Sequence, residues 1–211
     1  MKLYYFYVAP NPTKVRLYLA EKNAGGAEIP VTPVFVDLSK GEQLGPEHTA
    51  RNPFQTLPVL ELDDGTYVTE SLAAMEYLEE VYPAPSLLGT SAIERARVRQ
   101  LERIAESKVL VPIARFVHAT KSPLGAPPSP EIAASARLLL DKGLAFFDAL
   151  ASDDRAFVAG AAPTIADCTL AAALNFGRFG GVEIDGALAH LARWEAGYRQ
   201  RLAVQPVFGI G

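Results

Sequence analysis

The chain is poor in the residues that build metal sites and covalent cross-links. Its 211 residues include one cysteine, Cys168, and three histidines. A single cysteine excludes an internal disulfide and a cysteine-only zinc cluster. His48, His118 and His190 are widely spaced and form no HxxxH pair. We therefore expect no metal in the chemistry of this protein.

The chain also lacks a long hydrophobic run and an excess of basic residues. No apolar stretch approaches the roughly 20 residues that span a bilayer. Residues 1–9 join one lysine to an apolar run, but this run is aromatic-rich, precedes Pro10 and has no A-x-A cleavage signal. The 20 lysines and arginines are outnumbered by 24 aspartates and glutamates, whereas a nucleic-acid binder normally shows a basic patch. We expect a cytoplasmic protein with no membrane or nucleic-acid partner.

The first 82 residues carry alternating strand and helix signals. Asn11 is expected to cap the first helix, with Pro12 at its first position. An Asp-Gly pair between two apolar runs predicts a tight hairpin. The signals predict strand, helix, strand, short helix or loop, hairpin and helix, at residues 2–8, 11–24, 31–36, 41–51, 58–68 and 70–82. This part is therefore expected to form an α/β domain.

The rest of the chain lacks strand signals and predicts only helices. Pro83 and Pro85 interrupt the preceding helix, so residues 83–88 are expected to form a linker. Pro112 is expected to kink a helix that begins near Ile93. Further helices are expected after Ser129, after a capping box of Thr164 and Asp167, and around Trp194, at residues 130–147, 166–174 and 188–202. Residues 89–211 are thus expected to form an all-helical bundle domain.

Three motifs in this order resemble the cytosolic glutathione S-transferases, in particular their bacterial and theta-like members. They are APNPTKVRLYLAEKN at 9–23, NPFQTLPVLELDDG at 52–65 and TESLAAMEYLEEVYP at 69–83. The resemblance covers the whole chain. It implies that a thioredoxin-like domain at 1–82 binds glutathione as co-substrate, and that the helical domain contributes the electrophile site. It also implies a cytoplasmic homodimer with a role in detoxification. The helix from Ile93 to Leu110 is a candidate for the dimer interface.

The resemblance assigns glutathione-binding residues around the hairpin. The family has a cis proline where this chain has Leu57-Pro58, which lets the Leu57 main chain pair with the glutathione cysteine like an added strand. Glu70 and Ser71 match the clamp on the γ-glutamyl group, at a helix start that suits a carboxylate. The glycyl end is expected near Gln43, Gln55 and Thr56. From the residues alone, Pro58 also fits a trans proline opening a strand, and 69–71 also fit plain helix capping by Thr69.

The first-turn motif departs from the family at the thiolate donor. Theta-like enzymes carry a serine, and some bacterial relatives a threonine, where this chain has Ala9, which cannot donate a hydrogen bond. Asn11 resembles the asparagine that assists the thiolate in one bacterial group, and Tyr5 lies roughly where other classes carry a catalytic tyrosine. These two are our candidate catalytic residues, with Tyr7 and Thr13 behind them. Their structural alternatives are a helix cap for Asn11 and a core position for Tyr5.

The electrophile pocket is expected between the two domains. By position in the family, Ala9, Pro10, Arg115, Phe116 and His118 line it, together with Phe208 in the tail. Cys168 follows the capping box in an apolar helix and is expected to be an inert core thiol. The expected reaction is attack of the glutathione thiolate on an apolar electrophile. Glutathione-dependent disulfide reduction and a non-catalytic ligandin or scaffold are the alternatives.

Overall fold

A four-stranded sheet forms the centre of the first domain in the computed structural model, which describes residues 1–209. The strands β1 to β4 are Lys2–Tyr5, Thr32–Phe35, Val59–Glu61 and Tyr67–Thr69. Their order is β2-β1-β3-β4; β2 runs parallel to β1, while β3 and β4 are antiparallel to their neighbours. The expected strand at 2–8 is therefore central, although it ends at Tyr5, where the chain turns toward the first helix.

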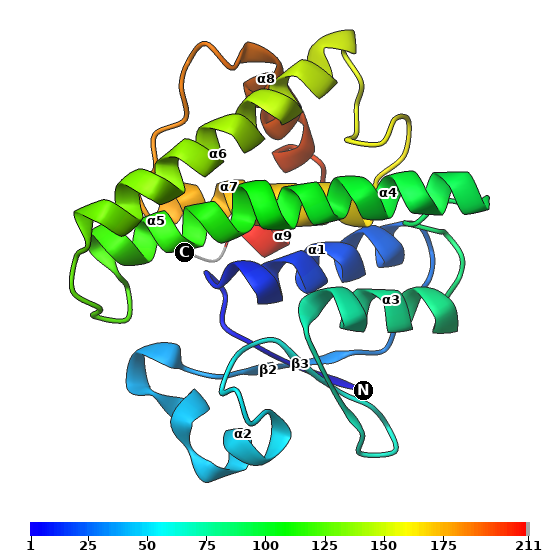
Figure 1. Cartoon of the computed structure of the whole chain (residues 1–211). Coiled ribbons are helices and arrows are strands. Elements are labelled where there is room, and N and C mark those ends of the chain that lie inside the picture. The colour runs from blue at the N-terminus through cyan, green and yellow to red at the C-terminus, as the bar shows by residue number, and fades with distance from the viewer. Residues whose placement is uncertain (210–211) are drawn as a thin grey trace.

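Helices cover both faces of this sheet (Figure 1). Helices α1 (Pro10–Ala24) and α3 (Ser71–Val81) lie on one face, and the short helix α2 (Pro46–Arg51) lies on the other. Side chains alternate along β1, so that Leu3 joins the main hydrophobic core while Tyr4 joins a smaller cluster on the α2 side. The short 3-10 helices Leu38–Lys40 and Glu42–Leu44 connect β2 to α2.

Two expected helix starts are corrected by the structure. Helix α1 has Ala9 as its N-cap and begins at Pro10, so Asn11 lies inside the first turn. A proline fits there because the first N–H groups of a helix have no intrahelical acceptor. Helix α3 has Glu70 as its N-cap in place of Thr69, with a backbone φ of 66°. At α1 the local sequence allows two starts, because a proline follows both Ala9 and Asn11, and the structure adopts the earlier one.

The second domain is built from helices, as expected. They are α4 (Ala92–Ile104), α5 (Val111–Lys121), α6 (Pro130–Leu150), α7 (Ile165–Phe179), α8 (Ala189–Arg199) and α9 (Gln205–Phe208), with a 3-10 turn at Ala151–Asp153. A π-helical segment, Ala105–Leu110, joins α4 to α5 just before Pro112. Pro112 has no N–H for the carbonyl four residues earlier, and Gly143 of α6 packs directly against that Lys108 carbonyl. No helix in the described part of the chain is long and apolar enough to cross a bilayer.

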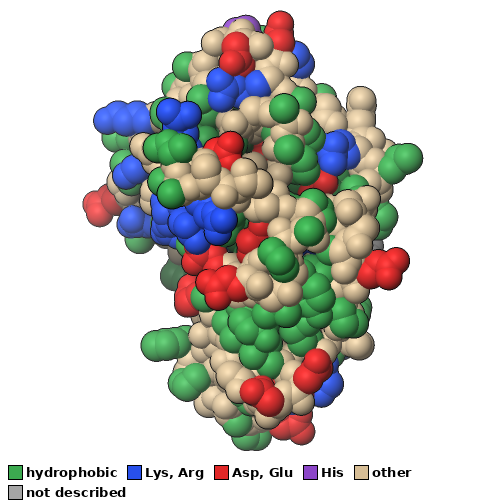
Figure 2. Space-filling model, turned by 90° about the vertical axis from the view of Figure 1, so that its right-hand side faces the viewer, with side chains coloured by type: hydrophobic (Ala, Val, Ile, Leu, Met, Phe, Trp, Pro, Cys, Tyr) green, Lys and Arg blue, Asp and Glu red, His purple; other side chains and the backbone are tan. Residues whose placement is uncertain are grey.

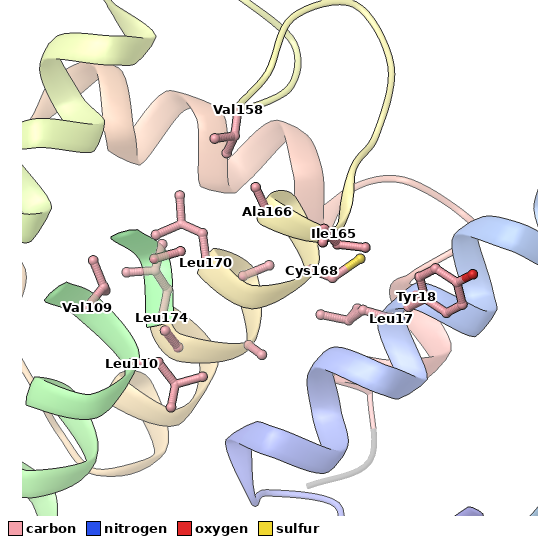
Figure 3. Close-up of a cluster of buried hydrophobic side chains, with 14 of the residues drawn as sticks. Leu17, Tyr18, Val109, Leu110, Val158, Ile165, Ala166, Cys168, Leu170 and Leu174 are labelled. Carbon is pink, nitrogen blue, oxygen red and sulfur yellow. The ribbon is translucent and has the colours of Figure 1, made fainter. Parts of the chain in front are cut away.

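Helix α7 is the centre of the whole molecule. Its capping box is formed as predicted, with the Thr164 N–H and hydroxyl both donating to Asp167 at 2.8 and 2.7 Å. Figure 3 shows Leu17 and Tyr18 of α1 beside Ile165 and Cys168 of α7, with Val109 and Leu110 of the π-helical segment on the other side. One core therefore spans the α/β and helical parts. Cys168 is fully buried, and burial raises the pKa of its thiol well above the usual value, as expected of an inert thiol.

The segment 83–88 is packed between the two parts. Leu87 and Leu88 are buried, and the Leu87 N–H donates to the Glu79 carboxylate at 2.8 Å. The Leu87 carbonyl accepts from the Ile165 N–H at 3.1 Å, at the start of α7. These contacts connect α3 to α7 through the segment. The division into residues 1–82, 83–88 and 89–211 stays a prediction.

Candidate active site

The first turn of α1 offers one free main-chain donor. Pro10 and Pro12 have no N–H, and the Thr13 N–H donates to the Ala9 carbonyl at 3.1 Å. The Asn11 N–H has no acceptor within residues 1–209. The Asn11 side-chain oxygen accepts a long 3.4 Å hydrogen bond from Ser71 Oγ, which leaves its amide nitrogen without a partner among the described residues. The starts of α1 and α3 therefore meet, with the donors of Asn11 available.

The turn before β3 presents another unpaired stretch of main chain. The Leu57–Pro58 peptide is cis, as the resemblance implies. Neither the N–H nor the carbonyl of Leu57 has a hydrogen-bond partner in the described part of the chain. Strand β3 begins only at Val59, where it pairs with Tyr4 of β1. Leu57 lies two residues before β3, and its polar groups remain free for an extended peptide.

Two buried polar residues hold this turn in place, and sequence reasoning missed both. Asn52 Nδ2 donates to the Thr56 carbonyl at 3.0 Å and to Thr56 Oγ1 at 2.9 Å. His48 Nε2 lies 3.0 Å from the same carbonyl. Asn52 also accepts from the Phe54 N–H at 3.1 Å. The sequence signal was the Asn-Pro pair at 52–53, which is typical of a turn start.

The remaining predicted glutathione-binding residues lie around these two turns. Gln55 has a φ of 56° and donates from Nε2 to Thr49 Oγ1 at 3.1 Å. Gln43 lies in the 3-10 helix before α2, and its side-chain oxygen is buried without a partner in the described range. Glu70 is exposed, whereas Ser71 is buried at the α3 N-terminus. Gln55 lies two residues before Leu57, and Glu70 and Ser71 follow Thr69, which pairs with Val59 of β3.

An apolar cleft of about 350 Å³ opens beside the first turn of α1. The α/β domain contributes residues 6–10, Leu38 and Ser39. The helical domain contributes His118 of α5, two residues of the following loop and two aromatic residues of α7, namely Pro123, Leu124, Phe176 and Phe179. The cleft thus lies between the two domains, where the electrophile pocket was expected.

The predicted electrophile residues divide into two groups. Ala9, Pro10 and His118 line the cleft. Arg115 is exposed on α5, outside the lining. Phe116 packs against the main core. A helix turns by about 100° per residue, so Phe116 and His118, two residues apart, face nearly opposite sides of α5. Phe208 also packs on the core, beneath the Arg199 guanidinium at 4.3 Å from its ring centroid.

The other donor candidates are occupied or displaced. The Thr13 hydroxyl donates to the carbonyls of Tyr7 and Ala9, at 3.1 and 2.9 Å, and is buried. Tyr5 lies outside the cleft lining, in an aromatic cluster with Tyr7 and Phe35. Its ring lies below the Arg16 guanidinium, 4.9 Å away. Asn11 is therefore the candidate whose donors remain free.

His118 is held as a neutral imidazole at the edge of the cleft. Its Nδ1 lies 2.9 Å from Ser122 Oγ. Burial lowers the pKa of His118 below its usual 6.5, so the uncharged ring predominates at pH 7. A neutral imidazole can accept a proton, which makes His118 a candidate base.

A buried ion cluster fixes the opening helix from below. Lys14 of α1 contacts the carboxylates of Glu102 and Glu106, and both Lys14 and Glu102 are almost fully buried. Thr169 of α7 donates to Glu102 at 3.1 Å. Lys14 lies one turn beyond Asn11, so this cluster ties the candidate site to the helical domain.

A thioredoxin-like sheet with a cis-proline turn, joined through a shared core to a helical domain, defines the protein class. A family model described as "Glutathione S-transferase, N-terminal domain" matches residues 9–81, and one described as "Glutathione S-transferase, C-terminal domain" matches residues 109–200. The chain belongs to the glutathione S-transferase family, as the motifs predicted, and its enzyme class is that of a glutathione transferase.

Individual relatives agree with this assignment. Glutathione S-transferase 2 of Saccharomyces cerevisiae is 32% identical, over 100% of this chain and 90% of its own length. A maleylacetoacetate isomerase of Aspergillus fumigatus is also 32% identical, over 87% of this chain and 79% of its own. A crystal structure of a glutathione S-transferase domain-containing protein from Marinobacter aquaeolei superimposes with a TM-score of 0.87, at 35% identity over 97% and 100% of the two chains.

Proposed function

We propose that this chain transfers the glutathione sulfur to an apolar electrophile bound in the cleft between its domains. The observation that carries the proposal is that Ala9 and Pro10 line the cleft while the next residue, Asn11, holds the free donors of the same turn. A thiolate held at this turn adjoins an apolar volume of about 350 Å³. Nucleophile and electrophile would then meet at one place.

Glutathione would be bound mainly by main-chain atoms. Its cysteine would pair with the free N–H and carbonyl of Leu57, next to Pro58, as an added strand does. Its γ-glutamyl carboxylate would take the N-terminus of α3 and the Ser71 hydroxyl, and its ammonium group would pair with Glu70. Its glycyl end would lie near the side chains of Gln43, Gln55 and Thr56.

Asn11 would stabilise the thiolate. A free thiol has a pKa of about 8.5, and lowering it to about 6.5 requires about 2.7 kcal/mol. One hydrogen bond to a charged group contributes about 1.5–3 kcal/mol. The Asn11 N–H and side-chain amide are therefore sufficient donors without a hydroxyl at Ala9.

The reaction balances with His118 as the proton acceptor. The glutathione thiol gives its proton to the neutral imidazole, which later releases it to solvent. The thiolate then forms a carbon–sulfur bond at the electrophilic carbon. With an aryl chloride, the carbon–chlorine bond breaks and chloride leaves with the bonding pair.

The experiment that tests this role measures the thiol pKa of bound glutathione, from the ultraviolet absorbance of the thiolate against pH. Asn11→Ala is expected to raise that pKa by about 1–2 pH units and to slow conjugation of 1-chloro-2,4-dinitrobenzene accordingly. Tyr5→Phe is the matched control and should change neither. An unchanged pKa in Asn11→Ala would show that another group holds the thiolate.

Activity assays on the same purified protein distinguish two alternative functions. Turnover of a small disulfide alone would indicate a glutathione-dependent disulfide reductase. Glutathione binding with no turnover of either substrate would indicate a ligandin or scaffold. The missing hydroxyl at Ala9 is the observation that favours both.

We also propose that two copies of the chain associate in the cytoplasm. Helix α4 carries Ile93 with 60% of its surface exposed, and the turn before β3 carries Phe54 with 82% exposed. Figure 2 shows hydrophobic side chains gathered on the lower part of one face, over the α/β domain, with lysines and arginines above them. Light scattering of the wild type and of Ile93→Glu would test the association: the proposal expects a dimer mass that the variant lowers.

A further inference from the structure

A second hollow, which we call the α8 pocket, lies on the surface of the helical domain. Its volume is about 260 Å³. Figure 1 shows α8 at the end of the molecule away from the sheet, and none of the residues of this pocket lines the cleft beside α1. The lining comes from residues 154–157, from α8 and from the chain just after it: Asp154, Arg155, Ala156, Phe157, Arg193, Trp194, Gly197, Tyr198 and Arg201.

The α8 pocket is basic although the chain as a whole is acidic. Among the described residues, three arginines and one aspartate line it, whereas the whole sequence has 24 acidic residues against 20 lysines and arginines. The guanidinium group of arginine is planar and presents several N–H donors that match the oxygens of a phosphate or a carboxylate. The lining therefore favours an anion.

Two of these arginines keep hydrogen-bonding capacity that the protein does not use. Arg193 pairs with Asp154 through Nη1 and with the Ala151 carbonyl through Nη2, and its Nε has no partner within residues 1–209. Arg201 donates from Nε and Nη2 to Glu21, at 3.0 and 2.7 Å, and its Nη1 has no partner in the same range. Asp154 is 80% exposed, so its ion pair contributes little and a stronger anion can replace it.

The other two polar groups of the lining differ in what they offer. Arg155 uses all its nitrogens, on the Asp153 carboxylate and on the Val158 carbonyl, so it contributes only its charge. Trp194 is 4% exposed, and its indole N–H has no hydrogen-bond partner in the described part of the chain. Leaving a buried donor unpaired is costly, so such groups are rare in folded proteins. An oxyanion in the pocket is one source of the missing acceptor.

We propose that the α8 pocket binds the phosphate group of a small molecule, held by Arg193 and Arg201 in place of the Asp154 carboxylate. A phosphate group carries about 1.5–2 negative charges at pH 7, compared with one on a carboxylate, and it has three acceptor oxygens. It can therefore accept from both arginines at once. One water occupies about 30 Å³ in the liquid, so the pocket also has room for a small organic group.

The sequence supplies its own reporter for this site. Trp194 is the single tryptophan of the chain, so its fluorescence reports on the α8 pocket. The wild type is titrated with inorganic phosphate and, separately, with glycerol 3-phosphate, while sodium chloride keeps the ionic strength constant. We expect a saturable change in fluorescence, and a matching heat in isothermal titration calorimetry, with a dissociation constant of about 0.1–1 mM.

The two titrations also distinguish the source of the phosphate. Tighter binding of glycerol 3-phosphate would identify a phosphate monoester as the ligand, and equal dissociation constants would identify the free ion. Absence of saturation in both signals for both compounds, up to about 10 mM, would overturn the proposal. Glutathione conjugation is not measured in this experiment, so its outcome is independent of the proposed function.

Two substitutions test the assignment to residues. Arg193→Gln removes a charged donor and should weaken phosphate binding about tenfold or more. Asp154→Asn removes the competing carboxylate and should tighten binding about three- to tenfold. Asp154 has a φ of 60°, a conformation that asparagine adopts readily. Arg137→Gln is the matched control, because Arg137 pairs with Asp141 at 2.8 Å on α6, outside the pocket.

The Asp154 variant keeps the test valid if Arg193→Gln fails to fold, because it retains every arginine of the pocket. The assignment is wrong if Arg193→Gln, folded by circular dichroism, binds phosphate as tightly as Arg137→Gln does. It is equally wrong if Asp154→Asn binds phosphate no more tightly than the wild type.

Discussion

The ion cluster beneath α1 predicts that replacing Lys14 by methionine destabilises the whole protein. Lys14 is 1% exposed, and its Glu102 partner is fully buried at 3.4 Å. Methionine fills a similar volume but leaves two carboxylates, Glu102 and Glu106, without the lysine. The partners that remain for Glu102 are the Thr169 hydroxyl and Arg103, which lies 3.7 Å away and is 54% exposed. Breaking a buried pair by removing one partner costs about 3–5 kcal/mol, because the remaining charge is uncompensated.

The magnitude translates into a clear shift in melting temperature. For a chain of this size, each kcal/mol lowers Tm by about 2–4 °C, so Lys14→Met should melt roughly 6–20 °C below the wild type. Circular dichroism during heating, and urea unfolding at 25 °C, would measure the change. Lys2→Met is the matched control: Lys2 also pairs with a glutamate, at 2.8 Å, but its side chain is 51% exposed. It should melt close to the wild type.

A double variant tests whether the uncompensated charge is the cause. Lys14→Met combined with Glu102→Gln removes the lysine and the fully buried carboxylate, and leaves only the Glu106 carboxylate, which is 16% exposed. The double variant should therefore recover more than half of the lost stability. The reasoning is refuted if Lys14→Met and Lys2→Met have the same melting temperature. It is also refuted if the double variant is no more stable than Lys14→Met alone.

Three further predictions follow from individual contacts. Asn52→Ala removes both hydrogen bonds to Thr56. Steady-state kinetics should show a several-fold higher KM for glutathione, and urea unfolding should show a free energy of unfolding lower by about 1–3 kcal/mol. Gly143→Ala places a methyl group against the Lys108 carbonyl and should lower the free energy of unfolding by about 1–3 kcal/mol. Gly197→Ala, in open space within α8, should raise it by up to about 1 kcal/mol. Equal urea midpoints for the two variants would contradict this expectation. Burial raises the pKa of the Asp167 carboxyl from 3.8 to about 6. The folded state therefore binds the carboxyl proton more tightly than the unfolded state does. The contribution of Asp167 to the free energy of unfolding is largest at low pH and falls as the pH rises through about 6. The free energy of unfolding of wild type relative to Asp167→Asn should therefore grow by about 1 kcal/mol from pH 7 to pH 5, and a flat difference would count against it.

The sequence could predict features whose signals are local. The Asp-Gly turn, the capping box of Thr164 and Asp167 and the apolar pattern of α7 each depend on neighbouring residues, and each formed as predicted. The order of domains followed from the loss of strand signals after Pro83. The family resemblance added the cis peptide at Pro58, which the residues alone left open.

The helix starts show where local signals compete. Asn11-Pro12 is a good capping pattern, but Ala9-Pro10 is an equally permissible start, and the Thr13 hydroxyl bonds back to the Ala9 carbonyl. The structure adopts the earlier start. This changes the role of Asn11 from a cap, whose oxygen is used by the backbone, to a first-turn residue with free donors.

The cleft could be predicted only in outline, because its walls come from distant segments. Ala9 and His118 were expected there, yet Phe179 and Leu124 were not, since α7 and the loop after α5 approach the sheet only in the folded chain. Asn52 was equally hidden: a buried asparagine gives the same sequence signal as an exposed one. Which side chain faces a cleft depends on how a helix is rotated, and packing decides that rotation.

Helix α1 explains why the site and the helical domain depend on each other. Asn11, Lys14 and Tyr18 lie three and four residues apart and so share one side of the helix. Asn11 follows Ala9 and Pro10, which line the cleft. Lys14 is paired with Glu102 of α4, and Tyr18 donates to Glu79 of α3 at 2.9 Å. Any rotation of α1 that redirected Asn11 would also break two buried polar contacts. The proposed thiolate donor is therefore positioned by charges in the helical domain, and the sequence alone does not show that Lys14 is buried.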